Sequence, residues 1–325
     1  GARPAARGLP LGGADRTVSG ASSARGAAVA IGVFDGLHIG HRAILDRALE
    51  RARERAAPSV VMSFDPHPDV VLKRGDFRIP PPLTPLGEKR ALLSAMGVGV
   101  FHVLPFTREL AALEPEAFVD RHLVEPFAPF ALVVGEGFAL GRGRSGTCER
   151  LRAIGATRGF TVDEVPLVVL DGEPVSSTRI RARLAEGAVA EAARLLGRRY
   201  ALTGMVVTGD GRGRELGFPT ANLRLDAERL VPGDGIYAVL AKIRGEAEWR
   251  PAAMSIGMRP TFDGQLRTLE VHLLDWKGDL VGRTMTVEFV DWLRPELRFE
   301  SAEALVEAMD RDVAETRRRL AAVVG

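Results

Sequence analysis

Residues 27–42 read Ala27-Ala-Val-Ala-Ile-Gly-Val-Phe-Asp35-Gly36-Leu-His38-Ile-Gly40-His41-Arg42. The stretch begins with small and apolar residues, as expected of a strand that is covered on both faces. Gly36 permits a sharp turn and a close approach of the backbone to a ligand. Apolar residues then recur with helical spacing from Ile39 to Arg55. The sequence therefore predicts a buried strand, a tight turn and a helix.

His38 and His41 lie three residues apart at the point where this helix should begin. That spacing places two side chains on one helix face, and a helix N-terminus offers free N–H groups to phosphate. Two imidazoles there are suited to hold a triphosphate and its departing pyrophosphate. The alternative interpretation is two capping or core histidines without a chemical role.

The pattern G-x-F-D-G-x-H-x-G-H over residues 32–41 resembles the nucleotidyltransferase signature of bacterial bifunctional riboflavin kinase/FAD synthetases. The resemblance continues from about Ala27 to the C-terminus. It implies a Rossmann-like nucleotidyltransferase domain followed by a riboflavin-kinase-like barrel. It also implies that His38 and His41 are catalytic and that the turn binds nucleotide through Gly32, Phe34, Asp35 and Gly36.

Composition narrows the class of protein. The chain has 325 residues, enough for two domains, with 46% hydrophobic and 26% charged residues, as in soluble globular proteins. A net charge of +2 without a basic arm predicts no nucleic-acid partner. No apolar run reaches 18 residues, so we expect no membrane span. The single cysteine, Cys148, fits a reducing cytoplasmic location.

The order of predicted elements divides the chain. We expect a flexible tail over residues 1–26, because it is rich in Gly, Ala, Ser, Pro and Arg. Strands and helices alternate over residues 27–186, which predicts an α/β adenylyltransferase domain with a parallel sheet and helices on both faces. A linker helix follows over residues 187–197. Consecutive strands over residues 198–325 predict an antiparallel β-barrel, closed by a C-terminal helix after Ser301.

Ligands of such parallel sheets bind beyond the carboxyl ends of the strands. His67, in Asp65-Pro66-His67-Pro68, follows the predicted strand Ser59–Phe64 at such an end. The resemblance places His67 near the nucleotide, and the alternative is a rigid turn without chemistry. Further along the domain, we predict helices that begin with Thr84 as N-cap and with Pro115 in the first turn.

Ser176-Ser177-Thr178-Arg179-Ile180-Arg181 follows a predicted strand and opens a helix. Hydroxyl groups and free N–H groups at a helix start suit phosphate, and arginine neutralises its charge. The motif resembles the second ATP-binding motif of the family, which implies that Ser176, Ser177, Thr178 and Arg181 bind nucleotide. The alternative is simple capping by Ser176 or Ser177.

Residues 141–146 spell G-x-G-x-x-G. A dinucleotide-binding fingerprint belongs directly after the first strand of a βαβ unit, and this one comes late, so we expect a loop over the site instead. Two residues depart from the family pattern. Gly137 stands where a polar residue often helps to bind flavin, and Pro174 stands where an arginine often helps to bind ATP. Both departures suggest, as an alternative, a riboflavin kinase whose first domain has lost catalysis.

Residues 209–222 read Gly209-Asp-Gly-Arg-Gly-Arg-Glu-Leu-Gly-Phe-Pro-Thr-Ala-Asn222. Glycine N–H groups can wrap phosphate. Thr220 and Asn222 face the same way in an extended segment, and their oxygens suit Mg²⁺. The stretch resembles the riboflavin kinase signature, and the alternative is a glycine-rich connection. The resemblance implies that these residues bind the substrates: Gly211, Gly213, Arg214, Gly217, Phe218 and Pro219.

Glu270 lies in a segment, residues 268–275, that otherwise suits a core strand. A carboxylate there is costly unless it is paired or functional, and it could accept the proton of an attacking hydroxyl group. The family has its catalytic glutamate in this segment, and the alternative is a salt bridge at the rim. Arg298 belongs to a stretch, residues 294–299, that resembles the flavin-side segment of the family.

We interpret the chain as a bifunctional enzyme that phosphorylates riboflavin to FMN and then joins AMP from ATP to FMN, releasing pyrophosphate and making FAD. Its partners would be ATP, riboflavin and FMN, with Mg²⁺ accompanying ATP and flavins as substrates and products. We expect at most a weak homo-oligomer. Two alternatives stay open. One is a riboflavin kinase with a degenerate first domain, and the other is a flavin- or nucleotide-binding regulator without activity.

Overall fold

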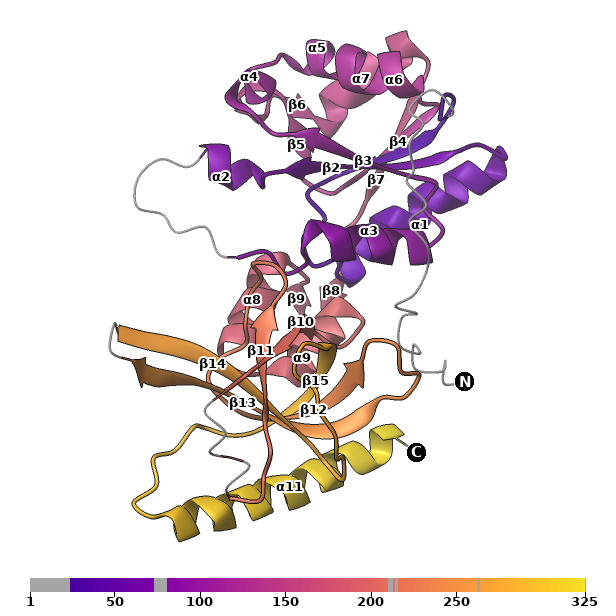
Figure 1. Ribbon diagram of the computed structural model, residues 1–325. Helices are drawn as coiled ribbons and strands as arrows, with labels where there is room; N and C mark the ends of the chain where they lie inside the picture. Colours follow the sequence, from indigo (N-terminus) through magenta and orange to yellow (C-terminus); the bar gives the residue numbers. More distant parts are fainter. Residues whose placement is uncertain (1–23, 73–80, 210–212, 214–215, 262–263, 325) are drawn as a thin grey trace. The chain divides into compact units, whose positions relative to one another are not determined.

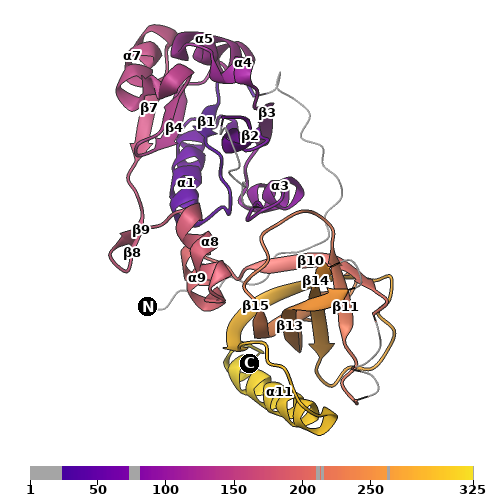
Figure 2. The same cartoon turned by 90° about the vertical axis from the view of Figure 1, so that its left-hand side faces the viewer.

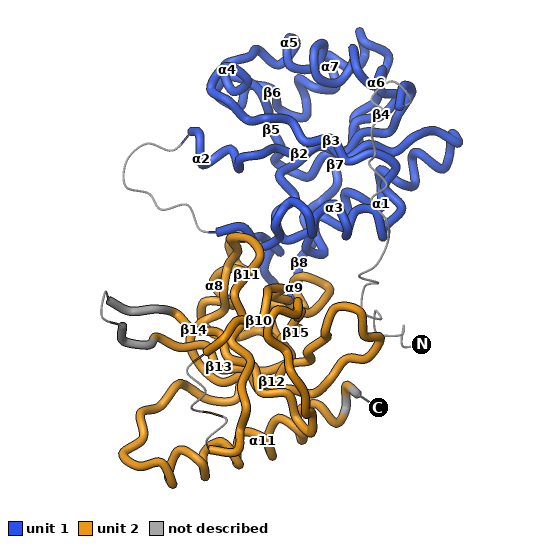
Figure 3. Tube along the Cα trace, in the orientation of Figure 1, with its two compact units in different colours: residues 1–177 blue, residues 178–325 orange. Residues whose placement is uncertain are grey.

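The computed structural model describes residues 24–72, 81–209, 213, 216–261 and 264–324 (Figure 1). The chain is divided into two compact units, residues 1–177 and residues 178–325 (Figure 3). Most of the expected tail, together with Gly211 and Arg214, lies outside the described residues. In the part of the chain that is described, no helix is both long and apolar enough to cross a membrane.

The first unit contains one parallel sheet in the order β3-β2-β1-β4-β7. Its strands are β1 (Ala28–Ile31), β2 (Ser59–Asp65), β3 (Val100–Pro105), β4 (Ala131–Gly135) and β7 (Thr161–Val165). Two short antiparallel pairs are added, β5 (Ala139–Leu140) with β6 (Gly146–Thr147) and β8 (Val169–Leu170) with β9 (Glu173–Pro174). The helices are α1 (Ile39–Glu54), α2 (Pro68–Leu72), α3 (Leu86–Ala95), α4 (Arg108–Ala111), α5 (Pro115–Val119), α6 (Glu125–Phe127) and α7 (Cys148–Arg158).

Alternate residues of the central strands face opposite cores. Val29 and Ile31 of β1 pack with residues of α5 and α7, whereas Ala30 packs with residues of α1 and α3. Figure 1 shows the same division, with α1 and α3 on one face of the sheet and α5, α6 and α7 on the other. The predicted parallel sheet with helices on both faces is therefore confirmed.

The predicted helix start at Pro115 is confirmed, and this helix then passes through a π-helical turn at Asp120–Val124 before it continues as α6. Two other local predictions need correction. Helix α3 begins at Leu86 with Pro85 as its N-cap, one residue later than expected, and the Thr84 N–H donates to the Asp35 carboxylate (3.2 Å). Residues 24–26, expected in the tail, belong to the folded unit, since Ala24 is fully buried.

The second unit is built on a closed barrel in the order β10-β11-β14-β13-β12-β15, with every pair antiparallel. Its elements are α8 (Ser177–Ala185), α9 (Val189–Leu196), β10 (Ala201–Val207), β11 (Ala221–Leu225), β12 (Gly235–Ile243), β13 (Arg250–Thr261), β14 (Gly264–Leu273), β15 (Thr284–Arg294) and α11 (Ala302–Val324). The sequence predicted the barrel but missed β11, although its residues alternate between buried and exposed as in a half-buried strand.

Two helices cover the outside of this barrel. Helix α9, which we expected as a linker, contacts β15 and buries Val189, Leu195 and Leu196. Helix α11 lies along β12, β13 and β15 (Figure 2). Its C-terminal half is fixed by Leu320, which packs on Ala238 and Leu240. The predicted C-terminal helix is thus confirmed, and it covers one side of the barrel.

Candidate functional sites

The two histidines of the opening motif lie together at the start of α1. His38 is the N-cap, and its Nδ1 accepts the His41 N–H (3.2 Å). The two rings are stacked, with centroids 3.6 Å apart and planes 18° from parallel. Because Nδ1 of His38 accepts a hydrogen bond, neutral His38 carries its proton on Nε2 and can donate it to phosphate. Capping and phosphate binding are therefore compatible at His38.

The environment of His41 favours a neutral ring. Burial, the neighbouring His38 and the Lys89 ammonium group hold the pKa of His41 well below its usual value. Its Nδ1 is buried without a hydrogen-bond partner among the described residues. A neutral imidazole with a buried unsatisfied nitrogen is ready to accept or donate one hydrogen bond when a ligand arrives.

The turn before these histidines is held by groups from three distant segments. The Val33 carbonyl accepts hydrogen bonds from Ser63 Oγ (2.8 Å) and Lys89 Nζ (2.8 Å). The Asp35 carboxylate accepts the N–H of Leu83 (3.1 Å and 3.2 Å to its two oxygens) and of Thr84. Much of the polar capacity of Asp35 is therefore used to hold the chain before α3.

The second predicted motif reaches the same turn. Ser177 Oγ donates to the Asp35 carbonyl (2.8 Å), 142 residues away in sequence. A Cβ at Gly40 would lie within 4 Å of the Val175 carbonyl. Ser176 and Ser177 thus lie beside the histidine motif, as their proposed common role requires. Thr178 and Arg181 follow on α8 in the second unit, and nucleotide binding by them stays a prediction.

Backbone geometry shapes this turn further. Phe34, Gly36 and Leu37 have φ values of +51°, +85° and +43°. Only Gly36 adopts such a value without steric cost, so the two other residues are strained. Gly32 lacks a side chain, and the Phe34 ring folds back over it. Such strain persists only where surrounding contacts fix the backbone in place. Here the hydrogen bonds to Val33 and Asp35 fix it.

A cavity of about 550 Å³ opens beside Gly32 in the first unit. Its wall combines aromatic rings with few polar groups and includes Phe64, His67, Phe106, Phe118, Phe138 and Arg144. His67 Nδ1 accepts the Asp69 N–H (3.1 Å), which fixes the ring at the rim. A flat, largely apolar ring system with polar edges suits such a wall.

The G-x-G-x-x-G stretch belongs to this cavity and opens no helix of a βαβ unit. It forms the turn between β5 and β6, and Gly141 and Gly143 line the cavity. Arg144 Nη2 donates to the Gly137 carbonyl (3.1 Å). The expected loop is thus observed at the cavity, in a position that does not follow β1.

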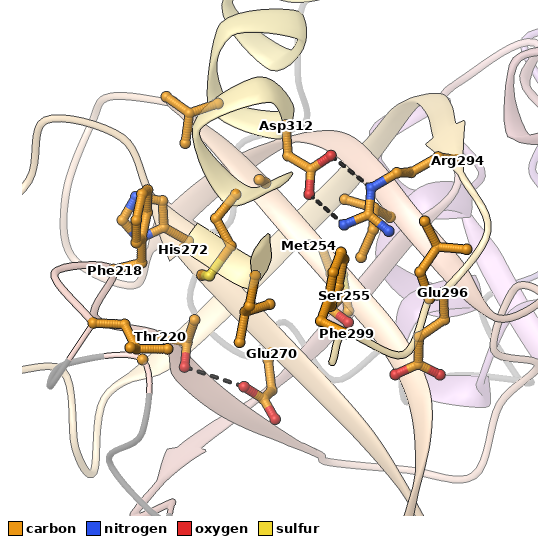
Figure 4. Close-up of a pocket in the computed structure, with 18 residues that line it drawn as sticks. Phe218, Thr220, Met254, Ser255, Glu270, His272, Arg294, Glu296, Phe299 and Asp312 are labelled. Carbon is orange, nitrogen blue, oxygen red and sulfur yellow. Dashed lines mark hydrogen bonds and ion pairs between the residues drawn. The ribbon is translucent and has the colours of Figure 1, made fainter. Parts of the chain in front are cut away.

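In the second unit, Thr220, Asn222 and Glu270 are brought together by strand pairing. Asn222 is opposite Glu270 in the β11–β14 register. Thr220 Oγ1 donates to Glu270 Oε2 (3.2 Å), as Figure 4 shows. A hydroxyl group, an amide and a carboxylate are suitable oxygen donors for Mg²⁺ and its phosphate ligands.

Two cavities meet at Thr220. One, of about 350 Å³, is lined by Glu270 and by mostly apolar groups such as Phe218, Ile236, Met254, Phe299 and Met309. The other, of about 390 Å³, is lined by Asn222, Gly209 and the segment from Trp276 to Val281. Thr220 therefore lies on the wall of both cavities, and Glu270 lies on the wall of the first.

The remaining predicted residues of this motif have distinct positions. Gly213 and Phe218 line the cavity with Glu270, and Phe218 N–H donates to the Gly213 carbonyl (2.7 Å). The Pro219 carbonyl accepts a hydrogen bond from His272 Nδ1 (2.9 Å). Gly217 has φ +86° and forms part of the turn. Arg298 is exposed and does not line either cavity.

Sequence reasoning missed several residues of these sites. Lys89 is nearly fully buried, and burial lowers its pKa; a lysine on the apolar face of a helix was the available signal. Asp312 lines the 350 Å³ cavity and is paired with Arg294, the first residue of the flavin-side stretch. No local pattern marks Asp312, because 18 residues separate it from Arg294. Among the described residues, no cluster of three or more His, Cys, Asp or Glu could hold a metal.

Comparisons with known proteins match a different family model to each of two parts of the chain. Residues 21–179 match the family model for FAD synthetase, and residues 196–320 match the model for riboflavin kinase. A bifunctional riboflavin kinase/FMN adenylyltransferase from Pseudomonas fluorescens is 42% identical over 297 residues, which covers 90% of this chain and 93% of the relative. The relative of that name from Escherichia coli is 39% identical over 287 residues, covering 88% and 90%.

A third relative of the same name, from Listeria monocytogenes, is 36% identical over 290 residues, or 89% of this chain and 91% of the relative. A crystal structure described as a macrolide-efflux protein from Streptococcus pneumoniae is 32% identical with a TM-score of 0.83, covering 90% of this chain and 94% of that one. Both domains and nearly the full length of the named relatives are matched. The chain therefore belongs to the family of bifunctional riboflavin kinase/FMN adenylyltransferases.

Proposed function

We propose that the second unit transfers the γ-phosphoryl group of ATP to the 5′-hydroxyl of riboflavin, and that the first unit then joins AMP from a second ATP to the FMN so formed. The overall products are FAD, ADP and pyrophosphate. The observation that carries the first step is the Thr220–Glu270 hydrogen bond at the meeting point of two cavities.

In the kinase step, riboflavin occupies the cavity lined by Glu270, and the nucleotide occupies the cavity lined by Asn222. Glu270 accepts the proton of the 5′-hydroxyl as its oxygen attacks the γ-phosphorus, and the bond to the ADP oxygen breaks. The Thr220 hydroxyl and the Asn222 amide oxygen, which lie beside Glu270, would hold Mg²⁺ against the phosphates. The ion would neutralise charge on the phosphate oxygens.

The nucleotide cavity has features that suit a base and a polyphosphate. Trp276 offers a ring on which a purine can stack. Lys277 provides a positive charge at the same cavity, and Gly209 lets the Asn222 amide approach the backbone closely. We therefore assign this cavity to ATP in preference to the more apolar one.

In the adenylylation step, a phosphate oxygen of FMN attacks the α-phosphorus of ATP, and pyrophosphate leaves. Charge increases on the bridging and terminal oxygens, and His38 Nε2–H and His41 are positioned to donate hydrogen bonds to them. The cavity beside Gly32 would receive the flavin ring, because its wall is aromatic. No protein nucleophile is required.

Gly137 and Pro174 bear on the kinase-only alternative. A side chain at Gly137 would meet no atom within 4 Å, so the space that a polar residue would fill is open. The carbonyl of Gly137 instead holds the Arg144 guanidinium at the rim of the cavity. Pro174 is exposed on β9. We propose that adenylylation proceeds without these two polar groups.

A flavin assay tests both steps. Purified protein is incubated with riboflavin, ATP and Mg²⁺, and riboflavin, FMN and FAD are separated by chromatography. Formation of FAD from riboflavin supports both activities. FMN without FAD, at every ATP and Mg²⁺ concentration, selects the kinase-only alternative. Binding of flavin or nucleotide without any product selects the non-catalytic regulator.

The expectations about nucleic acid, cellular location, Mg²⁺ and oligomeric state are also proposals. A net charge of +2 supports the absence of a nucleic-acid partner, and one cysteine supports a cytoplasmic location. Dependence on Mg²⁺ is tested by adding a chelator to the flavin assay. Sedimentation at several protein concentrations would detect a weak homo-oligomer.

A further inference from the structure

A bidentate ion pair joins the end of strand β15 to helix α11, which covers the barrel. Arg294, the last residue of β15, donates from Nε to Asp312 Oδ1 (2.8 Å) and from Nη2 to Asp312 Oδ2 (2.7 Å). The side chains are only 22% and 12% exposed. Paired charge-assisted bonds of this kind fix the mutual orientation of the two groups as well as their distance. Figure 4 shows the pair at the edge of the 350 Å³ cavity.

The pair connects two walls of that cavity. One wall is α11, which contributes Met309 and Val313. The other is the segment that follows β15, here called the wall segment (residues 295–299), which contributes Glu296 and Phe299. The wall segment belongs to no helix or strand. Its position therefore depends on side-chain contacts more than on backbone pairing.

Arg294 also organises the wall segment directly. Its Nη1 donates to the Pro295 carbonyl (2.9 Å), and its guanidinium lies 5.8 Å from the centre of the Phe299 ring. A second contact comes from β13. Gly257 has no side chain, and a Cβ there would collide with the Glu296 carboxylate. Glu296 can therefore rest against the backbone of β13.

We propose that the Arg294–Asp312 pair is a positioning device that holds the wall segment and α11 together and so determines how tightly the second unit binds riboflavin. The inference rests on the proposed kinase function of this cavity. Arg294 and Asp312 belong to different elements from Glu270 and Thr220. Breaking the pair should therefore weaken riboflavin binding while the chemical step continues at nearly the normal rate.

The test uses Asp312→Asn in the full chain, with Asp310→Asn as the matched control. Asp310 lies on the same helix, and its side chain is exposed. In Asp312→Asn, the KM for riboflavin and the Kd from flavin fluorescence quenching should both rise at least about tenfold, with kcat within about threefold. In Asp310→Asn, all three should stay within about twofold. If the pair had only a structural role, Asp312→Asn would lower both kcat and the melting temperature, without a selective rise in KM and Kd.

Charge reversal gives a second measurement. Arg294→Asp and Asp312→Arg should each raise the KM for riboflavin, and the double variant should recover most of the loss, because the pair is re-formed in the opposite order. If Asp312→Asn does not fold, the single and double charge reversals judge the pair. Gly257→Ala leaves the pair intact and displaces Glu296 from β13, so it tests the position of the wall segment separately and should raise the KM for riboflavin with kcat unchanged.

The outcomes separate this proposal from the one on which it rests. If the unaltered protein does not phosphorylate riboflavin, the proposed function fails, and the quenching assay alone then judges the pair. If the protein is active and riboflavin affinity is unchanged in Asp312→Asn, or in both charge reversals where Asp312→Asn does not fold, the pair has no positioning role. Loss of kcat with KM unchanged would also overturn it.

Discussion

The two sites of this chain are assembled in different ways. In the first unit, a strained turn is held by Ser63, Lys89 and Ser177, which come from three separate segments. In the second unit, Asn222 and Glu270 lie on neighbouring strands, and the register of the pair sets their distance. A site fixed by strand register depends on the barrel as a whole. A site fixed at a turn depends on a few individual hydrogen bonds.

This contrast has consequences for mutation. Single substitutions should affect one activity and leave the other unchanged. No residue of the turn before α1 takes part in phosphorylation, and no residue of the β11–β14 pair takes part in adenylylation. Residues that hold the turn should affect adenylylation although they do not touch substrate.

The largest change tests whether the barrel is complete without α9. Val189, Leu195 and Leu196 are buried, and burying such a side chain contributes about 1.5–3 kcal/mol, against a total of about 5–15 kcal/mol for a domain. A fragment of residues 197–325 should therefore be largely unfolded, whereas residues 178–325 should fold and phosphorylate riboflavin. Thermal unfolding by circular dichroism compares them. Equal melting temperatures would mean that α9 is only a linker.

Glu270→Gln should reduce riboflavin phosphorylation by about 10²–10⁴-fold, because a general base is lost while the shape of the side chain is kept. The conversion of supplied FMN into FAD should be unchanged in the same preparation. Phosphorylation within threefold of the unaltered protein would remove Glu270 from the mechanism.

His41→Ala should reduce FAD formation from FMN by about 10²–10³-fold, the usual effect of removing one preorganised hydrogen-bond donor. Riboflavin phosphorylation serves as the internal control and should stay the same. Should the variant make FAD as fast as the unaltered protein, the stacked histidines are capping residues and the phosphate site lies elsewhere.

Lys89→Met removes the ammonium group that binds the Val33 carbonyl. A hydrogen bond from a charged group contributes about 1.5–3 kcal/mol, so FAD formation should fall by about 10–100-fold. Arg90→Met, at the next position on α3, is the control and should stay within about twofold. Equal activity of both variants would show that the turn does not need Lys89.

The smallest effect is on stability in acid. The folded pKa of His41 is lowered, chiefly by burial, so the unfolded chain binds a proton more readily. Its contribution to stability is present above the unfolded pKa of about 6.5 and is lost as the pH falls, by about 1.4 kcal/mol per pH unit. In His41→Gln, the loss between pH 7.5 and pH 5.5 should be smaller, as measured by urea unfolding. An identical loss would mean that His41 is protonated when folded.

Local sequence patterns were enough to predict the two fold classes and many of the candidate site residues. Hydrophobic runs and turn residues act locally, so they predicted β1, α1 and the C-terminal helix. Motifs that combine glycine with reactive side chains marked His38, His41 and Thr220, and a carboxylate in an otherwise apolar strand marked Glu270. The missed strand β11 begins at the end of such a motif, where functional residues hide the alternation of a strand.

The contacts of each side chain, in contrast, are known only from the folded chain. It joins Ser177 to Asp35 across 142 residues and Arg294 to Asp312 between a strand end and a helix. It also assigns α9 to the barrel by burying its apolar face. These contacts depend on distances between segments that are far apart in the chain. A local sequence pattern does not contain these distances. Which side chains meet across a fold depends on how whole helices and strands pack against one another.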